Sequence, residues 1–199
     1  MMYSISTFLM KQLRLPIFTS KIKIYHLRIV PPEPVFDEIV HLKNQFETAF
    51  GKQLLSKSKP HITIATFKMN SKYQDTLITA FDQLSRFENF NLTIDGFDVF
   101  DKNSNTLYLK ITKTKSIEPI HKAVKILCSD NLGSRLKSLT IHKVPHITIS
   151  KTKGSTTLYK SLAHFQKIGY FKQIVVDHFT LVSRFKHKTW DWAHQIKLS

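Results

Sequence analysis

The chain has 199 residues, of which 42% are hydrophobic and 15 are phenylalanine, so it can bury the core of one domain and is not of the disordered class. Its formal net charge of +16 favours a polyanionic partner, RNA or DNA above all, although a lysine-rich surface also serves solubility. The five glycines form no phosphate-binding loop, the single cysteine excludes an internal disulfide, and no apolar run is long enough to span a bilayer. No membrane partner is therefore expected.

Residues 1–20 contain Lys11 and Arg14 but no acidic residue. The apolar stretch at residues 5–10 is short and has no clear cleavage site, which argues against a secretory signal. We expect residues 1–20 to form an N-terminal extension, with a transit peptide as the alternative. The single cysteine, Cys128, favours a reducing, cytoplasmic setting, and we expect its thiol to be buried and structural.

A strand is predicted over residues 22–30, and it ends at a run of prolines. Apolar residues then recur every three or four positions, at Val35, Ile39, Leu42, Phe46 and Phe50. This spacing predicts one face of a helix, with Pro34 near its first turn and Gly51 as its stop.

The same order of elements follows twice along the chain. Further helices are predicted over residues 73–87, 117–136 and 155–168, and further strands over residues 60–67, 90–100, 107–111, 145–149, 174–185 and 190–198. Each half therefore reads β-α-β-α-β, with an offset close to 85 residues, which is typical of a duplicated architecture. We expect an α/β (α+β) fold with a pseudo-two-fold repeat, in which residues 21–199 form a single bilobed domain with halves at about 21–102 and 103–199.

The pentapeptide Pro-His-Ile-Thr-Ile occurs at residues 60–64 and again at residues 145–149. Its β-branched residues favour a strand, and side chains alternate between the two faces of a strand. Each copy therefore has isoleucines to bury on one face and a histidine and a threonine on the other. We expect the two motif strands to present these polar faces to a central cleft, one from each lobe.

The four polar residues of the two motifs are His61, Thr63, His146 and Thr148, and together they suit phosphoester chemistry. Hydrolysis of a cyclic phosphodiester needs a base and an acid, and histidine with a pKa of about 6.5 can serve as either, each role contributing about 10² to 10⁴ in rate. The threonine hydroxyls can donate hydrogen bonds to the phosphoryl oxygens. An isolated His-x-Thr would more simply be a strand residue, but two copies in matching positions favour catalysis. No metal or cofactor is needed, and the symmetry leaves open which histidine is the acid.

Four further residues are weaker candidates. Lys151 and Arg184 could each contact a phosphate, or could each be ordinary surface charge. Tyr108 or Trp190 could stack on a base, although packing is the simpler role. A zinc site is not expected, because the histidines at 142 and 146 flank a Val-Pro pair that disfavours a helix, with no glutamate between them.

These features resemble the 2H phosphoesterase superfamily and, within it, the bacterial branch of 2′-5′ RNA ligases and RNA 2′,3′-cyclic phosphodiesterases. Residues 27–35 (LRIVPPEPV) resemble that branch's first strand and turn, and residues 177–183 (DHFTLVS) resemble its closing strand. The resemblance covers residues 21–199. Where the first motif of the branch continues with Phe-Leu-Gly this chain has Thr-Phe-Lys at residues 66–68, and Lys151 stands where the branch commonly carries an arginine.

The resemblance implies an enzyme that hydrolyses RNA 2′,3′-cyclic phosphate ends through His61 and His146, and that joins or breaks 2′-5′ linkages by the same chemistry in both directions. Its partner would be an RNA or oligonucleotide with such an end, and we expect a monomer. Two alternatives stay open: a module that binds RNA ends or nucleotide phosphates without chemistry, and a phosphodiesterase of small cyclic nucleotides. Salt-sensitive binding without turnover would favour the first, and a preference for mononucleotides the second.

Overall fold

The computed structural model describes residues 21–102, 104–112 and 114–199, so the extension predicted for residues 1–20 lies outside the described residues. The helices are α1 (Val35–Phe50), α2 (Gln74–Phe81), α3 (Ile117–Leu127) and α4 (Ser155–Ile168). The strands are β1 (Ile22–Ile29), β2 (Ile62–Asn70), β3 (Phe90–Phe100), β4 (Thr106–Thr112), β5 (Leu136–Ile141), β6 (His146–Lys151), β7 (Phe171–Val176), β8 (His178–Phe185) and β9 (Trp192–Lys197). Within these ranges no helix is long and apolar enough to cross a membrane.

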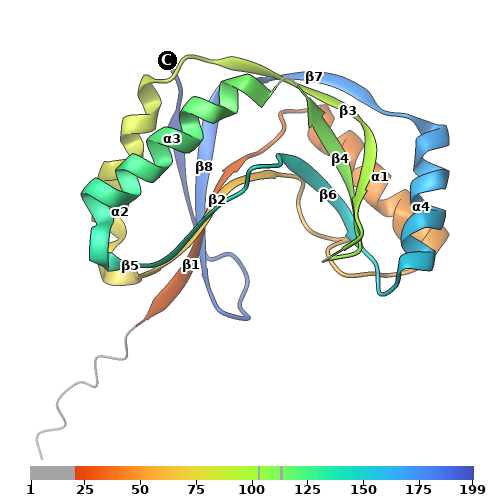
Figure 1. The fold of residues 1–199 in the computed structure, drawn as a ribbon, viewed down its shortest axis with the longest axis horizontal. Coiled ribbons are helices and arrows are strands. Elements are labelled where there is room, and N and C mark those ends of the chain that lie inside the picture. Colours follow the sequence, from red (N-terminus) through yellow and green to blue (C-terminus); the bar gives the residue numbers. More distant parts are fainter. Residues whose placement is uncertain (1–20, 103, 113) are drawn as a thin grey trace, which may run out of the picture.

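The strands form one antiparallel sheet in the order β7-β3-β4-β6-β2-β1-β8-β9, with β5 paired to β2 beside this path. Figure 1 shows the sheet bent into an arch, with the helices on its outer side. We call the part that holds β2, β1, β8, β9 and β5 the β2 limb, and the part that holds β6, β4, β3 and β7 the β6 limb. Helices α2 and α3 cover the first, and α1 and α4 cover the second. The helix-free inner side is called the concave face.

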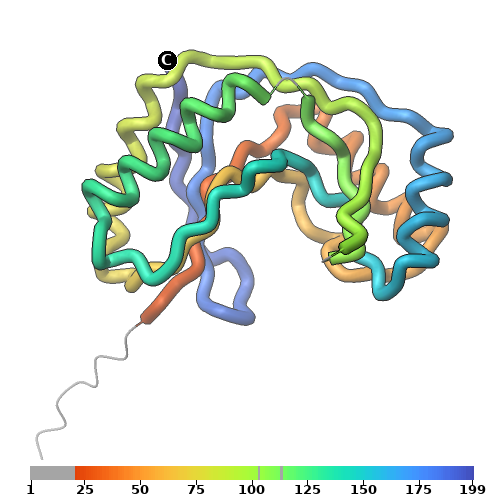
Figure 2. Tube along the Cα trace, viewed as in Figure 1, coloured from red at the N-terminus to blue at the C-terminus, as the bar shows by residue number. Residues whose placement is uncertain are grey.

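Strands that hold equivalent places in the two halves of the sequence, β2 and β6, β1 and β4, and β3 and β8, lie at equivalent places on either side of the β6–β2 pair. The expected pseudo-two-fold repeat is therefore present, with its axis between β6 and β2. The two halves of the sequence are nevertheless interleaved in space, as the colours of Figure 2 show. Strand β3 pairs with β4 and β7, α1 packs against β6, and α3 packs against β2. The predicted division near residue 102 falls in the short connection between the paired strands β3 and β4. Each limb is therefore built from both halves of the chain.

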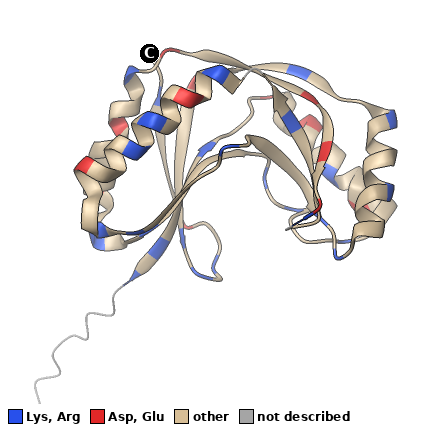
Figure 3. Cartoon of the chain, in the orientation of Figure 1, with Lys and Arg blue, Asp and Glu red and all other residues tan. Residues whose placement is uncertain are grey.

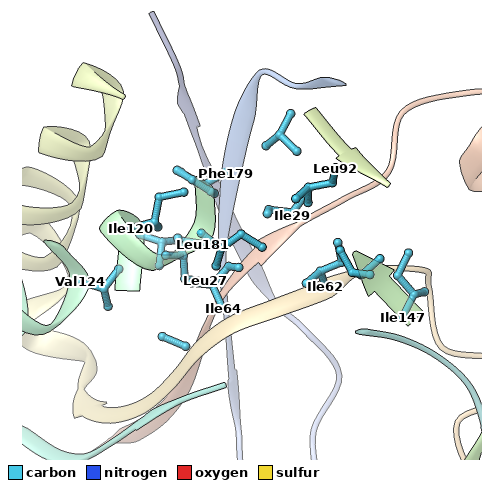
Figure 4. Close-up of a cluster of buried hydrophobic side chains, with 14 of the residues drawn as sticks. Leu27, Ile29, Ile62, Ile64, Leu92, Ile120, Val124, Ile147, Phe179 and Leu181 are labelled. Carbon is cyan, nitrogen blue, oxygen red and sulfur yellow. The ribbon is translucent and has the colours of Figure 1, made fainter. Parts of the chain in front are cut away.

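Alternating apolar residues of the strands form the core beneath the helices. Both isoleucines of each motif, Ile62 and Ile64 in β2 and Ile147 and Ile149 in β6, are fully buried. Figure 4 shows part of this cluster, in which strand residues meet Ile120 and Val124 of α3 on one side of the arch. Because an isoleucine buried in this way contributes about 2–5 kcal/mol relative to alanine, the isoleucines hold the motif strands in place and leave the polar residues on the concave face.

Two predicted elements differ in the structure. The helix expected over residues 117–136 ends at Leu127 and continues as a π turn and a 3₁₀ turn, where Gly133 adopts a φ of 43°. The chain then forms β5, a short strand that the sequence analysis did not predict. The single strand expected over residues 174–185 is two strands separated by Asp177, because β7 pairs with β3 while β8 pairs with β1 in the other limb.

Candidate active site

The two motif strands are neighbours at the centre of the sheet, with Ile62 and Ile147 as Cα partners. Because these isoleucines face the helices, the histidine and threonine of each copy point to the concave face. His61 and His146 are close enough for the charge of His146 to lower the pKa of His61. The structure therefore brings the four predicted motif residues to one place on one face of the sheet.

Each motif is followed by a β-bulge in the same position. Thr63 is the partner of Arg28, but Ala65 is the partner of Leu27, which makes Ile64 an extra residue. In the second copy, Thr148 is the partner of Tyr108 and Ser150 is the partner of Leu107, which makes Ile149 the extra residue. Bulges bend a strand and re-aim the side chains after it, and they occur often next to active sites.

The bulge decides where Lys151 points. In a regular strand, positions 148 and 151 would lie on opposite faces. Here Lys151 is the partner of Thr106, and Thr106 lies two residues from Tyr108, the partner of Thr148. Lys151 therefore returns to the same concave face as Thr148, and Thr66 holds the matching position after the first motif.

Both motif histidines are held by the same local hydrogen bond. The Nδ1 atom of His61 lies 2.7 Å from the carbonyl oxygen of Lys59, and that of His146 lies 2.9 Å from the carbonyl oxygen of Val144. A carbonyl only accepts, so each Nδ1 carries the proton and each Nε2 is left with a lone pair in the neutral ring. The acceptors precede Pro60 and Pro145, and a residue before proline is restricted to extended conformations, which orients its carbonyl.

Burial lowers the pKa of both rings, and nearby positive charge lowers that of His61 further. Burial is the largest cause that lowers the pKa of His61 to about 4, followed by the charge of Arg28, with Lys43 contributing further and the Lys59 carbonyl opposing. Burial also lowers the pKa of His146, against its hydrogen bond to Val144. An anionic phosphate bound between the rings would raise both pKa values towards neutrality.

The threonine hydroxyls of the two motifs are free to bind a ligand. Within the part of the chain that the structure describes, neither Thr63 nor Thr148 makes a side-chain hydrogen bond to another protein atom. Both side chains are only partly buried, so this costs little in the unliganded protein. Two hydroxyl donors beside two imidazoles suit an anion that carries several acceptor oxygens.

Lys43 ties the helical layer to the second motif. Its side chain is 2% exposed, and its Nζ donates to the carbonyl oxygens of Thr148 and Ile149 at 2.7 and 2.8 Å and to the hydroxyl of Ser58 at 3.3 Å. Burial lowers its pKa to about 8. The sequence analysis missed Lys43, although a lysine four residues after Ile39 on an apolar helix face was a visible signal.

Arg184 lies two strands from β2, in a basic and aromatic cluster that we call the Trp190 cluster; it consists of His26, Arg28, Arg184 and Trp190. The guanidinium carbons of Arg28 and Arg184 lie 4.0 and 4.8 Å from the centre of the Trp190 ring, and the ring of His26 lies 4.6 Å from it. This cluster borders a pocket of about 650 Å³ that His61 also lines. The sequence analysis missed His26 and Arg28, because their place beside the motif depends on strand order.

Aromatic rings border His146 instead. Tyr108 is 5% exposed and stacks on Phe100 at 4.2 Å, and the two rings lie 5.3 and 4.9 Å from that of His146. The two sides of the site therefore differ, with guanidinium groups beside His61 and packed aromatics beside His146. Among the described residues, no group of three or more His, Cys, Asp or Glu side chains is placed to hold a metal ion.

Positive charge dominates the strands around the site. Of the nine strands, β3 is the one that contains acidic residues, Asp95 and Asp98, and the other acidic residues lie on the helices and in the connections between elements (Figure 3). An anion that approaches the concave face therefore meets lysine, arginine and histidine first. The basic strands of the concave face therefore suit a phosphate-bearing ligand, although Figure 3 shows lysine and arginine on the helices as well.

Comparisons with known proteins agree with this fold. The protein TT0787 of Thermus thermophilus has a similar structure, with a TM-score of 0.61, 15% sequence identity and coverage of 88% of this chain and 98% of that one. Escherichia coli LigT in its apo form has a TM-score of 0.58 at 17% identity, covering 89% of this chain and 99% of LigT. An Oceanobacillus iheyensis protein named "Putative phosphoesterase OB1230" is 22% identical over 171 residues, which are 83% of this chain and 92% of the relative.

These likenesses establish the fold that the sequence predicted, the two-lobed fold of 2H phosphoesterases. The family relationship itself comes from the sequence, in which the family model of the 2′-5′ RNA ligase superfamily matches residues 31–188, a stretch that includes both His-x-Thr motifs. The chain therefore belongs to the 2′-5′ RNA ligase superfamily.

Proposed function

We propose that this protein is a phosphoesterase that opens 2′,3′-cyclic phosphate ends of RNA by general acid and base catalysis, with His61 and His146 as the catalytic pair. The observation that carries the proposal is that the two imidazole rings make the same hydrogen bond and have the same tautomer. Each donates from Nδ1 to a carbonyl two residues earlier, so each directs its reactive Nε2 elsewhere. A phosphate-binding module without chemistry would need donors here and would gain nothing from two lone pairs.

In the hydrolytic direction we assign the base to His61. The nearby charges of Arg28 and Lys43 favour its neutral form, which must accept a proton from water. The bound anionic phosphate raises the pKa of His146, so this ring takes up a proton at Nε2 from solvent. As the water oxygen bonds to phosphorus, the bond from phosphorus to one ribose oxygen breaks, and Nε2 of His146 donates that proton to the departing oxygen. The product is a phosphomonoester beside a free ribose hydroxyl. If the 5′-hydroxyl of a second strand replaces water and the 3′-oxygen is the one that leaves, the same step yields a 2′-5′ linkage.

Thr63, Thr148 and Lys151 would hold the phosphoryl oxygens. Thr63 and Thr148 donate their hydroxyl hydrogens as negative charge grows on the equatorial oxygens, a contribution that commonly reaches about 10²–10³ in rate for one donor. Lys151, on the same face as Thr148, supplies a positive charge where the bacterial branch commonly carries arginine. Arg184 belongs to the Trp190 cluster on the His61 side.

An RNA end as the ligand is supported by the basic concave face and by the family relationship. Crystal structures of Escherichia coli LigT, which shares the fold, include a complex with 3′-AMP, a nucleotide with its phosphate on the ribose 3′-oxygen. The cytoplasmic location and the monomeric state stay predictions from the sequence.

The direct test incubates the protein in EDTA with an RNA oligomer that ends in a 2′,3′-cyclic phosphate. Wild type should open the ring, and His61→Ala and His146→Ala should each lose nearly all turnover while keeping the wild-type unfolding curve. His41→Ala, on the exposed side of α1, is the matched control and should retain activity. Turnover retained by both catalytic-site variants would refute the proposal, and salt-sensitive RNA binding without turnover by wild type would favour a binding module.

A further inference from the structure

The Trp190 cluster gathers positive charge without a counterion. Arg28 on β1 and Arg184 on β8 place their guanidinium groups within 5 Å of one indole ring, at 4.0 and 4.8 Å from its centre. An Nη2 atom of Arg28 also lies 3.2 Å from Nδ1 of His26. A guanidinium only donates, so this Nδ1 accepts and the proton of His26 sits on Nε2, which adds one more donor to the cluster.

The two guanidinium groups have unused hydrogen-bond donors. Arg28 is 8% exposed, and the buried Nε atoms of Arg28 and Arg184 have no hydrogen-bond partner within the described residues. Neither arginine forms an ion pair with any acidic residue among them. The acidic residue that lines the adjoining pocket, Asp191, is held by Lys23 at 3.1 Å. Buried donors and unpaired cations are costly, and an anion is the ligand that would satisfy both.

The cluster lies beside the catalytic pair but apart from it. In the strand order β6-β2-β1-β8, Arg28 is one strand and Arg184 two strands beyond β2, which corresponds to about 5–10 Å at the usual strand spacing. A phosphorus atom held between the histidines of β2 and β6 would lie at the other edge of β2. The guanidinium groups are therefore placed for the next phosphate along a nucleotide chain, and the pocket of about 650 Å³ is lined by Arg28, Trp190 and His61 together.

The pseudo-two-fold repeat shows that this feature belongs to one limb. Arg28 is the cross-strand partner of Thr63, and the matching partner of Thr148 in the other limb is Tyr108. Tyr108 is packed against Phe100 and brings no positive charge. The two sides of an otherwise symmetric site therefore offer different groups to the substrate, which would fix the direction in which a nucleotide chain lies.

We propose that Arg28 and Arg184, braced on Trp190, form a second phosphate subsite that binds the phosphate on the 5′-oxygen of the nucleoside whose cyclic phosphate is opened. The inference rests on the proposed function and adds a substrate preference to it. A nucleoside 2′,3′-cyclic phosphate with no 5′-phosphate leaves the subsite empty. A substrate with a 5′-terminal phosphate, or with an internucleotide phosphodiester at that oxygen, fills it. Burial and the neighbouring Arg184 already lower the pKa of Arg28 to about 10, and a bound phosphate would relieve that repulsion.

Binding measured by calorimetry in EDTA tests the subsite separately from turnover. The ligands are adenosine 3′-phosphate, adenosine 3′,5′-bisphosphate and the dinucleotide ApAp. Wild type should bind at least one of the two ligands that carry a second phosphate about 10–100-fold more tightly than the monophosphate, as expected for charge-assisted hydrogen bonds to two arginines. A gain for ApAp identifies the internal phosphodiester as the ligand, and a gain for the bisphosphate alone identifies a 5′-terminal phosphate. Equal binding of all three would overturn the proposal.

Substitutions then assign the gain to the cluster. The ratio to follow is the dissociation constant of adenosine 3′-phosphate divided by that of the preferred ligand with a second phosphate. Arg28→Gln should reduce this ratio to within about threefold of one, since the side chain loses its charge and its fork of donors. Arg184→Gln, at a less buried position, should reduce the ratio as well, which keeps the test valid if the first variant does not fold. The charge-matched control is Lys186→Gln. Lys186 is an exposed lysine in the β8–β9 connection, which also holds Trp190, and this variant should keep the wild-type ratio.

A loss of affinity in Arg28→Gln that is equal for adenosine 3′-phosphate and for the bisphosphate would instead assign Arg28 to the catalytic phosphate and overturn the subsite. Turnover provides an independent comparison. The kcat/KM of wild type should be about 10–100-fold higher for a 5′-phosphorylated adenosine 2′,3′-cyclic phosphate than for the unphosphorylated compound. If neither is opened but the binding preference is present, the proposed function fails and the subsite stands.

Discussion

Ile62 and Ile147, the central residues of the two motifs, are Cα partners across the antiparallel β2–β6 pair. Extending this register by one residue in either direction sets the histidine of each motif opposite the threonine of the other. A phosphate bound there would be approached by an imidazole and a hydroxyl from each copy. The two motifs therefore form one composite site at the axis of the repeat, and neither copy is complete alone.

The tautomer of the motif histidines is directly measurable. Because Lys59 and Val144 accept through carbonyl oxygens, neutral His61 and His146 should both carry their proton on Nδ1. Long-range proton–nitrogen correlation spectra above pH 7 should show Nε2 as the unprotonated nitrogen of both rings. A protonated Nε2 in either ring would contradict the assignment of that atom as the proton acceptor.

Removing one motif hydroxyl should slow the reaction without unfolding the protein. Thr63→Val and Thr148→Val keep the side-chain shape, and neither hydroxyl has a protein partner to lose within the described residues. We expect kcat to fall by about 10²–10³ in each variant, as for the loss of one transition-state donor. Steady-state kinetics beside Thr48→Val, an exposed threonine of α1, would check this, and wild-type rates in both motif variants would exclude the hydroxyls from catalysis.

The acid limb of the pH profile should report His61. Its pKa is held to about 4, with Arg28 as the largest charge that lowers it. Arg28→Gln removes a positive charge, so the pKa of His61 should rise and the acid limb of kcat/KM should move to higher pH. Arg28→Lys keeps the charge and should leave the limb close to its wild-type position. A limb that stays in place in Arg28→Gln would count against His61 as the base.

Stability should depend on pH through the buried neutral histidines. Burial and neighbouring cations lower the pKa of His26 to about 3, whereas the unfolded chain titrates near 6.5. Between these values the unfolded state binds more protons than the folded state, so the free energy of unfolding rises with pH through this window. The stability that the neutral His26 contributes is therefore lost progressively as the pH falls below about 6.5. Urea unfolding at several pH values should show this slope, flatter in His26→Gln and unchanged in His41→Gln. Equal slopes in wild type and His26→Gln would contradict it.

Lys43 should be required for stability. Lys43→Met keeps the length of the side chain but leaves the carbonyl oxygens of Thr148 and Ile149 without this donor. We expect a loss of about 2–4 kcal/mol in the free energy of unfolding, measured in urea, because buried acceptors lose their partner. Lys160→Met, at an exposed position of α4, is the matched control and should change stability by less than about 0.5 kcal/mol. A loss equal to the control would show that the buried amine is dispensable.

Local patterns in the sequence predicted most of the fold. The bounds of α1 agree with the apolar spacing from Val35 to Phe50, and the structural comparisons confirm the two-lobed fold class. The strand β5 was missed because the predicted helix was continued past Gly133 to residue 136, whereas in the structure it ends at Leu127. The interleaving of the two limbs was missed because the apolar alternation of a strand shows which face is buried but not which strand it pairs with. The pairing of β3 with β4 could therefore not be predicted from either strand alone.

The surroundings of the site were harder to predict than the motifs. Alternation places a histidine and a threonine on one face, but it gives the wrong face for a residue beyond a bulge, as for Lys151. Arg28 and His26 lie more than 30 residues before the first motif and become its neighbours only through the β1–β2 pair. Lys43 was detectable as a charge on an apolar helix face, but its acceptors, on β6, are set by tertiary packing.

The central claim, that two histidines share one turnover, is tested most directly by comparing single and double variants. Single-turnover opening of an RNA 2′,3′-cyclic phosphate should be measured in EDTA for wild type, His61→Ala, His146→Ala and the double variant. Groups that act together are not additive, so the account predicts that the double variant is about as slow as the slower single variant. Near-wild-type rates in either single variant, or rate losses that multiply in the double variant, would contradict it.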